Sequence, residues 1–418
     1  MEFNQYIIDG RKAFSRLNYT EFDRANHIDF FDNDEIIYYL GKLPLRKSRG
    51  SFSVCDAVDF KLNSEDVSLL KKPSDSLNLP DCIVEKIKKR QIMYINTEYP
   101  LWRHKLTDQL PEKWTVNLLA LGDVGSTLLI GLKLLGGDAI DGIGIYDRNE
   151  SNLKRWEIET NQISHPFHNN LPFVKIIPHE QLFDCHMFVF CASKGVPSVG
   201  SDVRDVRMIQ FEENAKIITT YAKMARNTGF KGIFSVVSDP VDQLCYTVFK
   251  ESNTDEHGNW DYKGLSPEQI KGYGLGVMHA RAIYFSKKNV SLSHYENEGR
   301  AFGPHGSDLV IADSIKRYNQ ENSLTLTNNA ISANLEVRSL GYKPYIAPAL
   351  SSGALSIIKT ITREWHYSAN FIGGAFMGSK NKHHRSGIEL ERIKMDNQLE
   401  SRIQKTYEKL RDFNEKQN

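Results

Sequence analysis

The chain lacks an excess of charge of either sign and lacks any long apolar run. Its 418 residues include 53 basic and 52 acidic side chains, a net charge of +1. Without a strongly basic field, nucleic acid and anionic membranes are not expected as partners. No run of about 18 apolar residues occurs, and the N-terminus "MEFNQYIIDGRK" has no apolar signal segment. We therefore expect a soluble, cytoplasmic protein with a small-molecule partner.

Cysteine is also scarce and scattered. The five cysteines are odd in number and widely spaced, and none lies in a C-x-x-C pair. This pattern argues against a disulfide framework and against a cysteine zinc site. The adjacent His383 and His384 in "KNKHHRSG" are interpreted as solvated residues of a basic turn, so no metal is predicted. The apolar content of 40% is enough to build a core.

The chain has two parts with different sequence patterns. Residues 1–111 mix aromatic and charged residues without a strong period, which indicates an N-terminal extension of unknown role. From Val116 onward, short apolar runs alternate with helical patterns, which predicts an α/β fold with a doubly wound parallel sheet. The polar stretch "KESNTDEHGNWDYKG" is interpreted as a surface loop. The ending "GIELERIKMDNQLESRIQKTYEKLRDFNEKQN" predicts a C-terminal helix that packs one apolar stripe on the body.

The stretch "VNLLALGDVGSTLLIGLKLLGG" leads from an apolar strand through Gly122 and Gly125 directly into a helix. Gly122 lets the backbone approach a pyrophosphate, Gly125 lets the helix pack closely, and the helix N-terminus offers free N–H groups. Ala120 stands where the first glycine of G-x-G-x-x-G is expected. The pattern nevertheless predicts a dinucleotide-binding turn.

The next strand, "GIGIY", ends at Asp147. A carboxylate at this place accepts hydrogen bonds from the adenosine ribose hydroxyls and repels a 2′-phosphate. NAD is therefore favoured over NADP, although the neighbouring Arg148 weakens that preference.

Several segments together resemble the lactate and malate dehydrogenase family over about residues 115–400. They are "LGDVGST", "FCASKGVPSVGSDVRDVRMIQFEEN", "VSDPVD", "KGLSPEQIKGYGLGVMHAR" and "GPHGSD", in the order that the family has. The interval from Arg281 to His305 equals the family's interval between its substrate arginine and its catalytic histidine. The resemblance implies an NAD-dependent oxidoreductase that transfers a hydride between nicotinamide and a 2-hydroxy or 2-oxo carboxylic acid.

The same resemblance implies a Rossmann-type dinucleotide-binding domain at residues 112–250. A mixed α+β substrate domain would follow at residues 251–418, with the extension at 1–111 in front. Oligomers are common in the family, so a homo-oligomer is expected by analogy.

The resemblance also assigns roles to individual residues. His305 would exchange a proton with the substrate oxygen, Arg281 would bind the substrate carboxylate through its planar guanidinium, and Arg207 would polarise the reacting carbonyl. The implied cofactor contacts are Gly122, Asp123, Val124, Gly125, Asp147, Ala192, Asn214, Val237 and Ser352. The loop from Cys191 to Arg207 is longer than usual, and the substrate-selecting residue is placed at Ser201, with Arg204 close behind.

Two departures from the family pattern concern the histidine. Met278 occupies the place of the aspartate that normally pairs with it, and Asp239 replaces the asparagine of the family's Asn-Pro-Val-Asp segment. We hypothesise that Asp239 supports His305 electrostatically, with Asp308 as a weaker candidate, or that Asp239 contacts a cationic group on the substrate.

These departures keep two other functions open. The first is a dinucleotide-binding sensor or assembly subunit with impaired catalysis, for which Met278 and Asp239 are the signs. The second is a dehydrogenase acting on an amino or imino acid, in which Asp239 would bind an ammonium group.

Overall fold

The N-terminal extension is a five-stranded sheet with a covering helix. The computed structural model describes residues 2–25, 35–74, 77–107, 110–167, 170–194 and 203–417, without the side chains of 203–207. The strands follow the spatial order β1-β2-β3-β5-β4. Their bounds, with the helix, are β1 Asn4–Ile8, β2 Arg11–Ser15, β3 Ile37–Gly41, β4 Ser51–Ser53, β5 Ile92–Asn96 and α1 Asp81–Lys88.

Local chemistry explains the hairpin of β1 and β2. Asp9 and Gly10 adopt φ angles of 50° and 75°, as tight two-residue turns that match the strand twist require. Strands β3 and β5, by contrast, are buried at every position. They therefore lack the alternation that marks a half-exposed strand, and their sequence shows no strong period.

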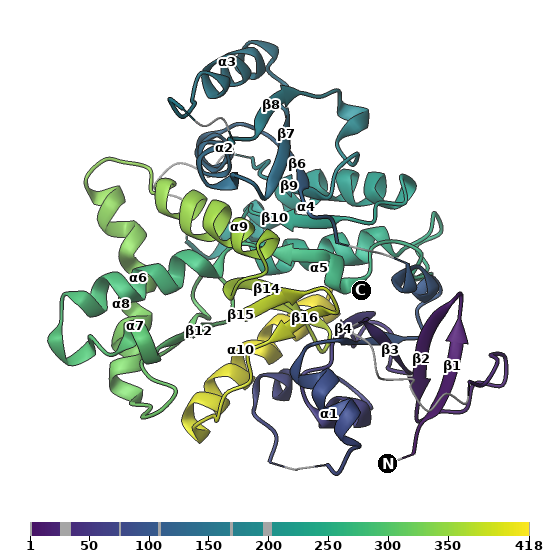
Figure 1. Ribbon diagram of the computed structural model, residues 1–418. Coiled ribbons are helices and arrows are strands. Elements are labelled where there is room, and N and C mark those ends of the chain that lie inside the picture. The colour runs from purple at the N-terminus through teal and green to yellow at the C-terminus, as the bar shows by residue number, and fades with distance from the viewer. Residues whose placement is uncertain are drawn as a thin grey trace.

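The body is organised around a nine-stranded sheet in the order β16-β15-β14-β11-β10-β9-β6-β7-β8 (Figure 1). The strands from β11 to β8 pair in parallel, and β14 to β16 add antiparallel pairs. The strand bounds are β6 Trp114–Leu119, β7 Ile140–Tyr146, β8 Phe173–Ile176, β9 Met187–Phe190, β10 Ile233–Val236, β11 Ile270–Gly272, β14 His366–Ile372, β15 Ala375–His384 and β16 Gly387–Leu390.

Numbered along the chain, the parallel strands lie in the order 3-2-1-4-5-6, the arrangement of a Rossmann fold. Strand β9 shows why such strands are continuously apolar: Phe188 and Phe190 belong to the core on one face, and Met187 and Val189 to the core on the other. The predicted doubly wound α/β fold is confirmed. The parallel part of this sheet continues to residue 272, beyond residue 250. The division of the chain into two domains at residue 250 stays a prediction.

Helices cover both faces of this sheet. Helices α4 and α5 contribute to one core, and α2, α3 and α9 to the other. The helix bounds are α2 Asp123–Gly136, α3 Glu150–Asn161, α4 Val203–Asn227, α5 Val241–Ser252, α6 Leu275–Lys287, α7 Tyr295–Glu298, α8 Gln320–Ser339, α9 Leu355–Ile361 and α10 Asn397–Glu415, with a π-helical segment at Pro348–Ala354. A small two-stranded sheet, β12 Arg300–Phe302 and β13 Val310–Ala312, completes the body. No helix among the described residues is long and apolar enough to span a membrane.

The prediction of a helix for the whole tail is wrong at its beginning. Gly387–Leu390 pairs with β15 as strand β16, and the helix starts only at Asn397, where Asp396 caps it by accepting from Gln398 N–H. From there α10 buries the stripe of Leu399, Ile403, Tyr407 and Leu410, as its spacing predicts. His384, predicted to be solvated, lies on β15 with Nε2 2.6 Å from Glu389.

Polar contacts fasten the N-terminal sheet to the body. Arg90 pairs with Glu389 at 2.7 Å, and Arg392 pairs with the fully buried Asp59. Figure 1 shows the N-terminal part, in purple and dark blue, beside β16 and α10. Since removing one partner of a buried ion pair costs about 3–5 kcal/mol, the Asp59 contact holds the two parts in one orientation.

Candidate active site

The glycine turn lies between β6 and α2, at the N-terminus of the helix. Gly122 is the N-cap residue, and Asp123, Val124 and Gly125 form the first turn of α2. A Cβ on Gly125 would lie 2.0 Å from the carbonyl oxygen of Ala120, so this position admits only glycine. A Cβ on Gly122 would meet no atom within 4 Å. The space in front of the helix N-terminus is therefore open to a ligand.

Ala120 occupies the first glycine position of the motif, and its backbone has the conformation of a glycine. Its φ is 73°, in the left-handed region that costs an L-residue about 1 kcal/mol. The turn thus keeps the geometry of the motif although the residue has changed.

Asp147 joins the end of β7 to the glycine turn. Its Oδ2 accepts from Leu121 N–H at 2.7 Å, and its Oδ1 accepts from Asn149 N–H at 3.0 Å. Each carboxylate oxygen can accept a second hydrogen bond. The carboxylate therefore holds the turn and still has capacity for a ligand hydroxyl.

Asp147 also forms part of the wall of a cavity of about 530 Å³. The cavity lies at the carboxyl ends of β6, β7 and β9, where the strand order of the sheet reverses and ligands of such folds bind. It is lined by Leu119, Ala120, Tyr146, Asp147, Arg148, Ala192, Ser193, Lys194, Glu213, Lys216, Ile217, Thr220 and Tyr221.

Of the other predicted cofactor contacts, Ala192 lines this cavity, and Val237 follows β10 and packs against the core under α2. Asn214 is fully buried: its Oδ1 accepts from Lys194 N–H at 3.0 Å, and its Nδ2 donates to the Asp239 carbonyl at 2.7 Å. The Asn214 side chain therefore positions the Asp239 loop.

Ser352 is buried in the π-helical segment, against the N-terminus of α6. Its hydroxyl donates to the Gly274 carbonyl at 2.7 Å and accepts from Val277 N–H at 2.8 Å. The hydroxyl thus joins two elements of the protein, and its direct contact with a cofactor stays a prediction.

The structure brings His305 and Asp239 together from two elements. His305 lies in the turn after β12, and Asp239 lies in the loop after β10. The Nδ1 atom of His305 is 3.2 Å from Asp239 Oδ1, and the Nε2 atom of His305 is buried without a hydrogen-bond partner among the described residues. One ring nitrogen thus contacts a carboxylate, and the other is left for a ligand.

Arg281 approaches the same place from α6. Its Nη1 donates to the Ala330 carbonyl at 3.1 Å and lies 3.5 Å from the sulfur of Met278. Burial lowers the pKa of Arg281, and the negative charge of Asp239 acts in the opposite direction. A guanidinium stays charged at neutral pH in such surroundings, so the site combines an imidazole, a carboxylate and a fixed positive charge.

The competing carboxylate points elsewhere. Asp308 pairs with Lys409 of α10 at 2.5 Å, so of the two predicted partners it is Asp239 that contacts the His305 ring. Among the described residues, no group of three or more His, Cys, Asp or Glu side chains could hold a metal ion.

Three predicted residues lie outside the description. Ser201 is not described, and neither are the side chains of Arg204 and Arg207, whose backbone belongs to α4. Their roles stay predictions.

The sequence of this chain matches that of one enzyme family. The family model described as lactate/malate dehydrogenase, NAD binding domain, matches residues 115–260. An L-lactate dehydrogenase of Staphylococcus haemolyticus is 24% identical over 247 residues, 57% of this chain and 72% of that protein. A malate dehydrogenase of Aliarcobacter butzleri is 22% identical over 196 residues, 47% of this chain and 57% of the relative.

Solved structures of such enzymes share the fold. The minor L-lactate dehydrogenase from Enterococcus mundtii superposes with a TM-score of 0.59 at 17% identity, covering 73% of this chain and 99% of its own. The malate dehydrogenase from Picrophilus torridus gives 0.57 at 17% identity, with 72% and 97% covered. Over residues 115–260 the chain is similar to the NAD-binding domain of the lactate/malate dehydrogenase family, and its fold is that of the solved structures of such enzymes. At the level of that family, the similarity supports an oxidoreductase that uses a nicotinamide dinucleotide.

The residues of the glycine turn and of the end of β7 fit such a cofactor. The open space before Gly122, the uncapped N-terminus of α2 and the carboxylate of Asp147 lie together at the carboxyl ends of β6 and β7. A bound dinucleotide would place its pyrophosphate at the helix N-terminus and its adenosine ribose near Asp147.

One residue of this candidate site was not predicted from the sequence. Asp242, in the same "SDPVD" segment as Asp239, is buried, and it interacts with the backbone N–H groups of His305 and Gly378. Burial raises the pKa of Asp242 to about 8, and the nearby charge of Asp239 acts in the same direction. In the sequence, the position of Asp242 in the "VSDPVD" segment was the signal that could have identified it. Its burial against the backbone of His305 appears only in the folded structure.

Proposed function

We propose that the protein is an NAD-dependent dehydrogenase that interconverts a 2-hydroxy carboxylic acid and the corresponding 2-oxo acid. The 3.2 Å contact between Asp239 and His305 carries this proposal, because it leaves the buried Nε2 as the nitrogen that faces a substrate. Bound in the pocket, the nicotinamide ring would accept or donate the two electrons and the hydrogen of C2.

His305 moves the proton in this proposal. During oxidation Nε2 accepts the proton of the substrate hydroxyl, and during reduction it returns that proton to the carbonyl oxygen. Asp239 keeps the proton of Nδ1 in place and stabilises the imidazolium, so its role is to orient the acid–base group.

Arg281 binds the carboxylate of the substrate. Only one of its five N–H donors is used by a carbonyl among the described residues, the one to Ala330. The remaining donors can form the two-pronged contact that a planar guanidinium makes with a carboxylate. Arg207, by family resemblance, would polarise the carbonyl, with Ser201 and Arg204 near the substrate side chain.

Asp147 is the basis for proposing NAD over NADP. Its carboxylate would repel a 2′-phosphate and accept from the ribose hydroxyls, whereas Arg148 in the same wall acts against this preference. A cytoplasmic location and assembly into a homo-oligomer belong to the proposal by analogy with the family.

The test is a turnover assay of the full chain with NADH and, separately, NADPH against a panel of 2-oxo acids. We expect consumption of NADH with at least one acid and a lower kcat/KM with NADPH. Tight binding of NADH without turnover of any acid would instead favour a sensor or assembly subunit.

The second candidate is an amino or imino acid dehydrogenase, and the half-exposed carboxylate of Asp239 is the observation that favours it. The same panel with ammonia added tests it. Turnover that requires ammonia in the reductive direction would replace the 2-hydroxy acid assignment, since Asp239 would then bind an ammonium group.

A further inference from the structure

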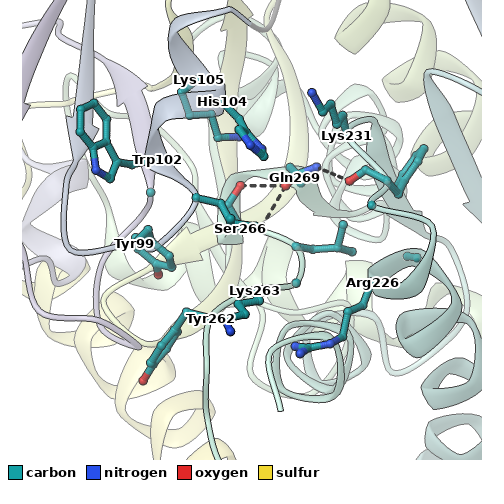
Figure 2. Close-up of a pocket in the computed structure, with 17 residues that line it drawn as sticks. Tyr99, Trp102, His104, Lys105, Arg226, Lys231, Tyr262, Lys263, Ser266 and Gln269 are labelled. Atoms are coloured by element: carbon teal, nitrogen blue, oxygen red, sulfur yellow. Dashed lines mark hydrogen bonds between the residues drawn. The ribbon is translucent and has the colours of Figure 1, made fainter. Parts of the chain in front are cut away.

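A second cavity lies between the N-terminal sheet and the body. Its volume is about 290 Å³, close to the lower end of the roughly 300–1,000 Å³ range of small-molecule sites. Figure 2 shows Tyr99 and Trp102 on one side and Arg226 and Lys231 on the other. The residues that line it are Gly50, Tyr99, Leu101, Trp102, His104, Lys105, Ala225, Arg226, Gly229, Phe230, Lys231, Tyr262, Lys263, Gly264, Leu265, Ser266 and Gln269.

Hydrogen bonds across the junction hold the N-terminal wall of this cavity against the body. Glu268, next to Gln269 in the body, accepts from Gly50 N–H and from the Ser51 hydroxyl, each at 2.9 Å, and lies 3.3 Å from Lys105 Nζ. The two walls are therefore held together by contacts within the protein.

The polar insertion after α5 contributes to the wall on the side of the body. Residues 256–259 are exposed, as expected of a surface loop, whereas Tyr262 and Lys263 line the cavity. The rings of Tyr262 and Tyr99 meet edge to face at 6.0 Å. The end of the insertion therefore contacts the N-terminal part of the chain at this pair of rings.

Aromatic side chains lie in both walls of the cavity, namely Tyr99, Trp102, Phe230 and Tyr262. Aromatic rings attract a further ring through stacked or edge-to-face contacts, beyond the effect of the area that is buried. In the described part of the chain, the Tyr262 hydroxyl and the Trp102 indole N–H make no hydrogen bond with the protein. The walls thus favour a flat ring that carries a hydrogen-bonding group.

The basic side chains of the walls do not select an anion, because the protein itself supplies their partners. Arg226 forms a two-pronged ion pair with Asp261, at 2.7 and 2.6 Å. Arg226 holds the pKa of Asp261 below its ordinary value, and the charge of Lys263 acts in the same direction. Lys105 has its carboxylate partner at 3.3 Å, and Lys231 interacts with another group of the protein.

A cation is not favoured either, because none of the described lining residues is acidic. A ligand of either charge would lose hydration in this cavity without gaining an ion pair that replaces it. The charges of the walls therefore favour an uncharged ligand.

We propose that the junction cavity binds a small, uncharged aromatic molecule of one or two fused rings that carries a hydroxyl or amide group. The cavity shares no lining residue with the cavity beside Asp147, so a dinucleotide bound there would leave it empty. This site goes beyond the proposed dehydrogenase function and does not depend on it.

Calorimetric titration of the full chain with 2-naphthol at neutral pH tests the proposal without any need for turnover. Decahydro-2-naphthol has the same frame without an aromatic ring, 2-naphthoate carries a negative charge, and 2-naphthylmethylammonium carries a positive charge. We expect saturable binding of 2-naphthol at one site, at least about tenfold tighter than each comparison ligand. Saturating NADH should leave this binding unchanged.

Two variants remove a ring from the walls. Trp102→Leu should weaken the binding of 2-naphthol about tenfold, and Tyr262→Leu about three- to tenfold. Trp102 also contacts the ring of Phe22 at 6.0 Å, so Tyr262→Leu decides the matter if Trp102→Leu does not fold. Tyr284→Leu, at a tyrosine of α6 that is 53% exposed, is the matched control and should bind as the parent does.

Four results would overturn the proposal. The first is the absence of saturable binding of 2-naphthol. The second is equal or tighter binding of the saturated alcohol, the carboxylate or the ammonium compound. The third is displacement of 2-naphthol by NADH, because it would place the ligand in the nucleotide crevice. The fourth is unchanged binding in Tyr262→Leu.

Discussion

Two turns of this protein each depart from the family pattern, and the departures are accommodated in different ways. At the glycine turn, Ala120 takes the place of a glycine and keeps a φ of 73°. Beside the histidine turn, Met278 of α6 takes the place of an aspartate, and Asp239 from the loop after β10 lies 3.2 Å from His305. The first change remains as strain in one residue, whereas the second is offset through space.

The physical reason is the range of each effect. A backbone dihedral angle belongs to one residue, so no neighbour can relieve the cost of a side chain there. A carboxylate acts on an imidazole through hydrogen bonding and charge, so any element that reaches the ring can supply it. Substitutions at the two turns should therefore differ in size and in whether a second substitution rescues them.

The largest effect is expected from Asp239→Asn. Without the carboxylate His305 loses its orienting partner, and kcat/KM should fall about 10²-fold or more, with a changed pH profile. Introducing Met278→Asp into this variant should restore part of the activity, because it returns a carboxylate at the family position. Asp308→Asn, whose parent residue pairs with Lys409, is the control and should stay near the parent rate. An unchanged kcat/KM and pH profile in Asp239→Asn would remove its assigned role.

Arg281→Lys tests the carboxylate contact that the histidine turn serves. Lysine keeps the charge but loses the planar fork, so kcat/KM should fall roughly 10- to 100-fold, mainly through KM. Steady-state kinetics with the acid found in the panel measure this. The exposed Arg155→Lys on α3 is the matched control, and an equally small effect at both positions would contradict the assignment.

Asp242→Asn should change the pH dependence of stability. Because burial raises the pKa of Asp242 to about 8, the native state keeps a proton that the unfolded chain releases above its ordinary pKa of 3.8. The parent therefore loses stability as pH rises between these values, by up to about 1.4 kcal/mol per pH unit. Urea unfolding at several pH values should show a flatter profile for the variant. Parallel profiles would mean that Asp242 is ionised in the native protein.

Ala120→Gly should have the smallest effect. Glycine adopts the observed φ without strain, so the free energy of unfolding should rise by about 0.5–1 kcal/mol with kcat/KM unchanged. Ala333→Gly, within α8, is a control of opposite sign and should lower that free energy by roughly 1 kcal/mol. A loss of stability in both variants would show that the turn favours alanine for another reason.

The central sheet could be predicted from the sequence and the N-terminal sheet could not. The run around Phe188 and Phe190 is apolar because both of its faces are covered, and the strand–turn–helix order after Val116 leaves few alternatives. In the N-terminal part, strands of three to five residues buried on both sides show no period. The helix predicted for the tail is wrong at Gly387–Leu390, which forms strand β16. A run of four residues is too short for its pattern to separate a strand from the start of a helix.

The candidate site was partly predictable. The hypothesis that Asp239 supports His305 came from comparing two exchanged positions, and the observed contact supports it. The bonds of Asn214 and Ser352 to neighbouring backbone groups could not be foreseen, because they depend on which loops meet at the sheet edge.

The order of residues alone determined the local unit from Trp114 to Asp147, since strand, turn and helix each follow from neighbours along the chain. Only the tertiary structure decided that Asp239 meets His305, 66 positions away, and that the added sheet and the body enclose a cavity with aromatic residues in its walls. Side chains so distant in sequence are brought within hydrogen-bonding range by the packing of whole elements, and short-range propensities carry no information about that packing.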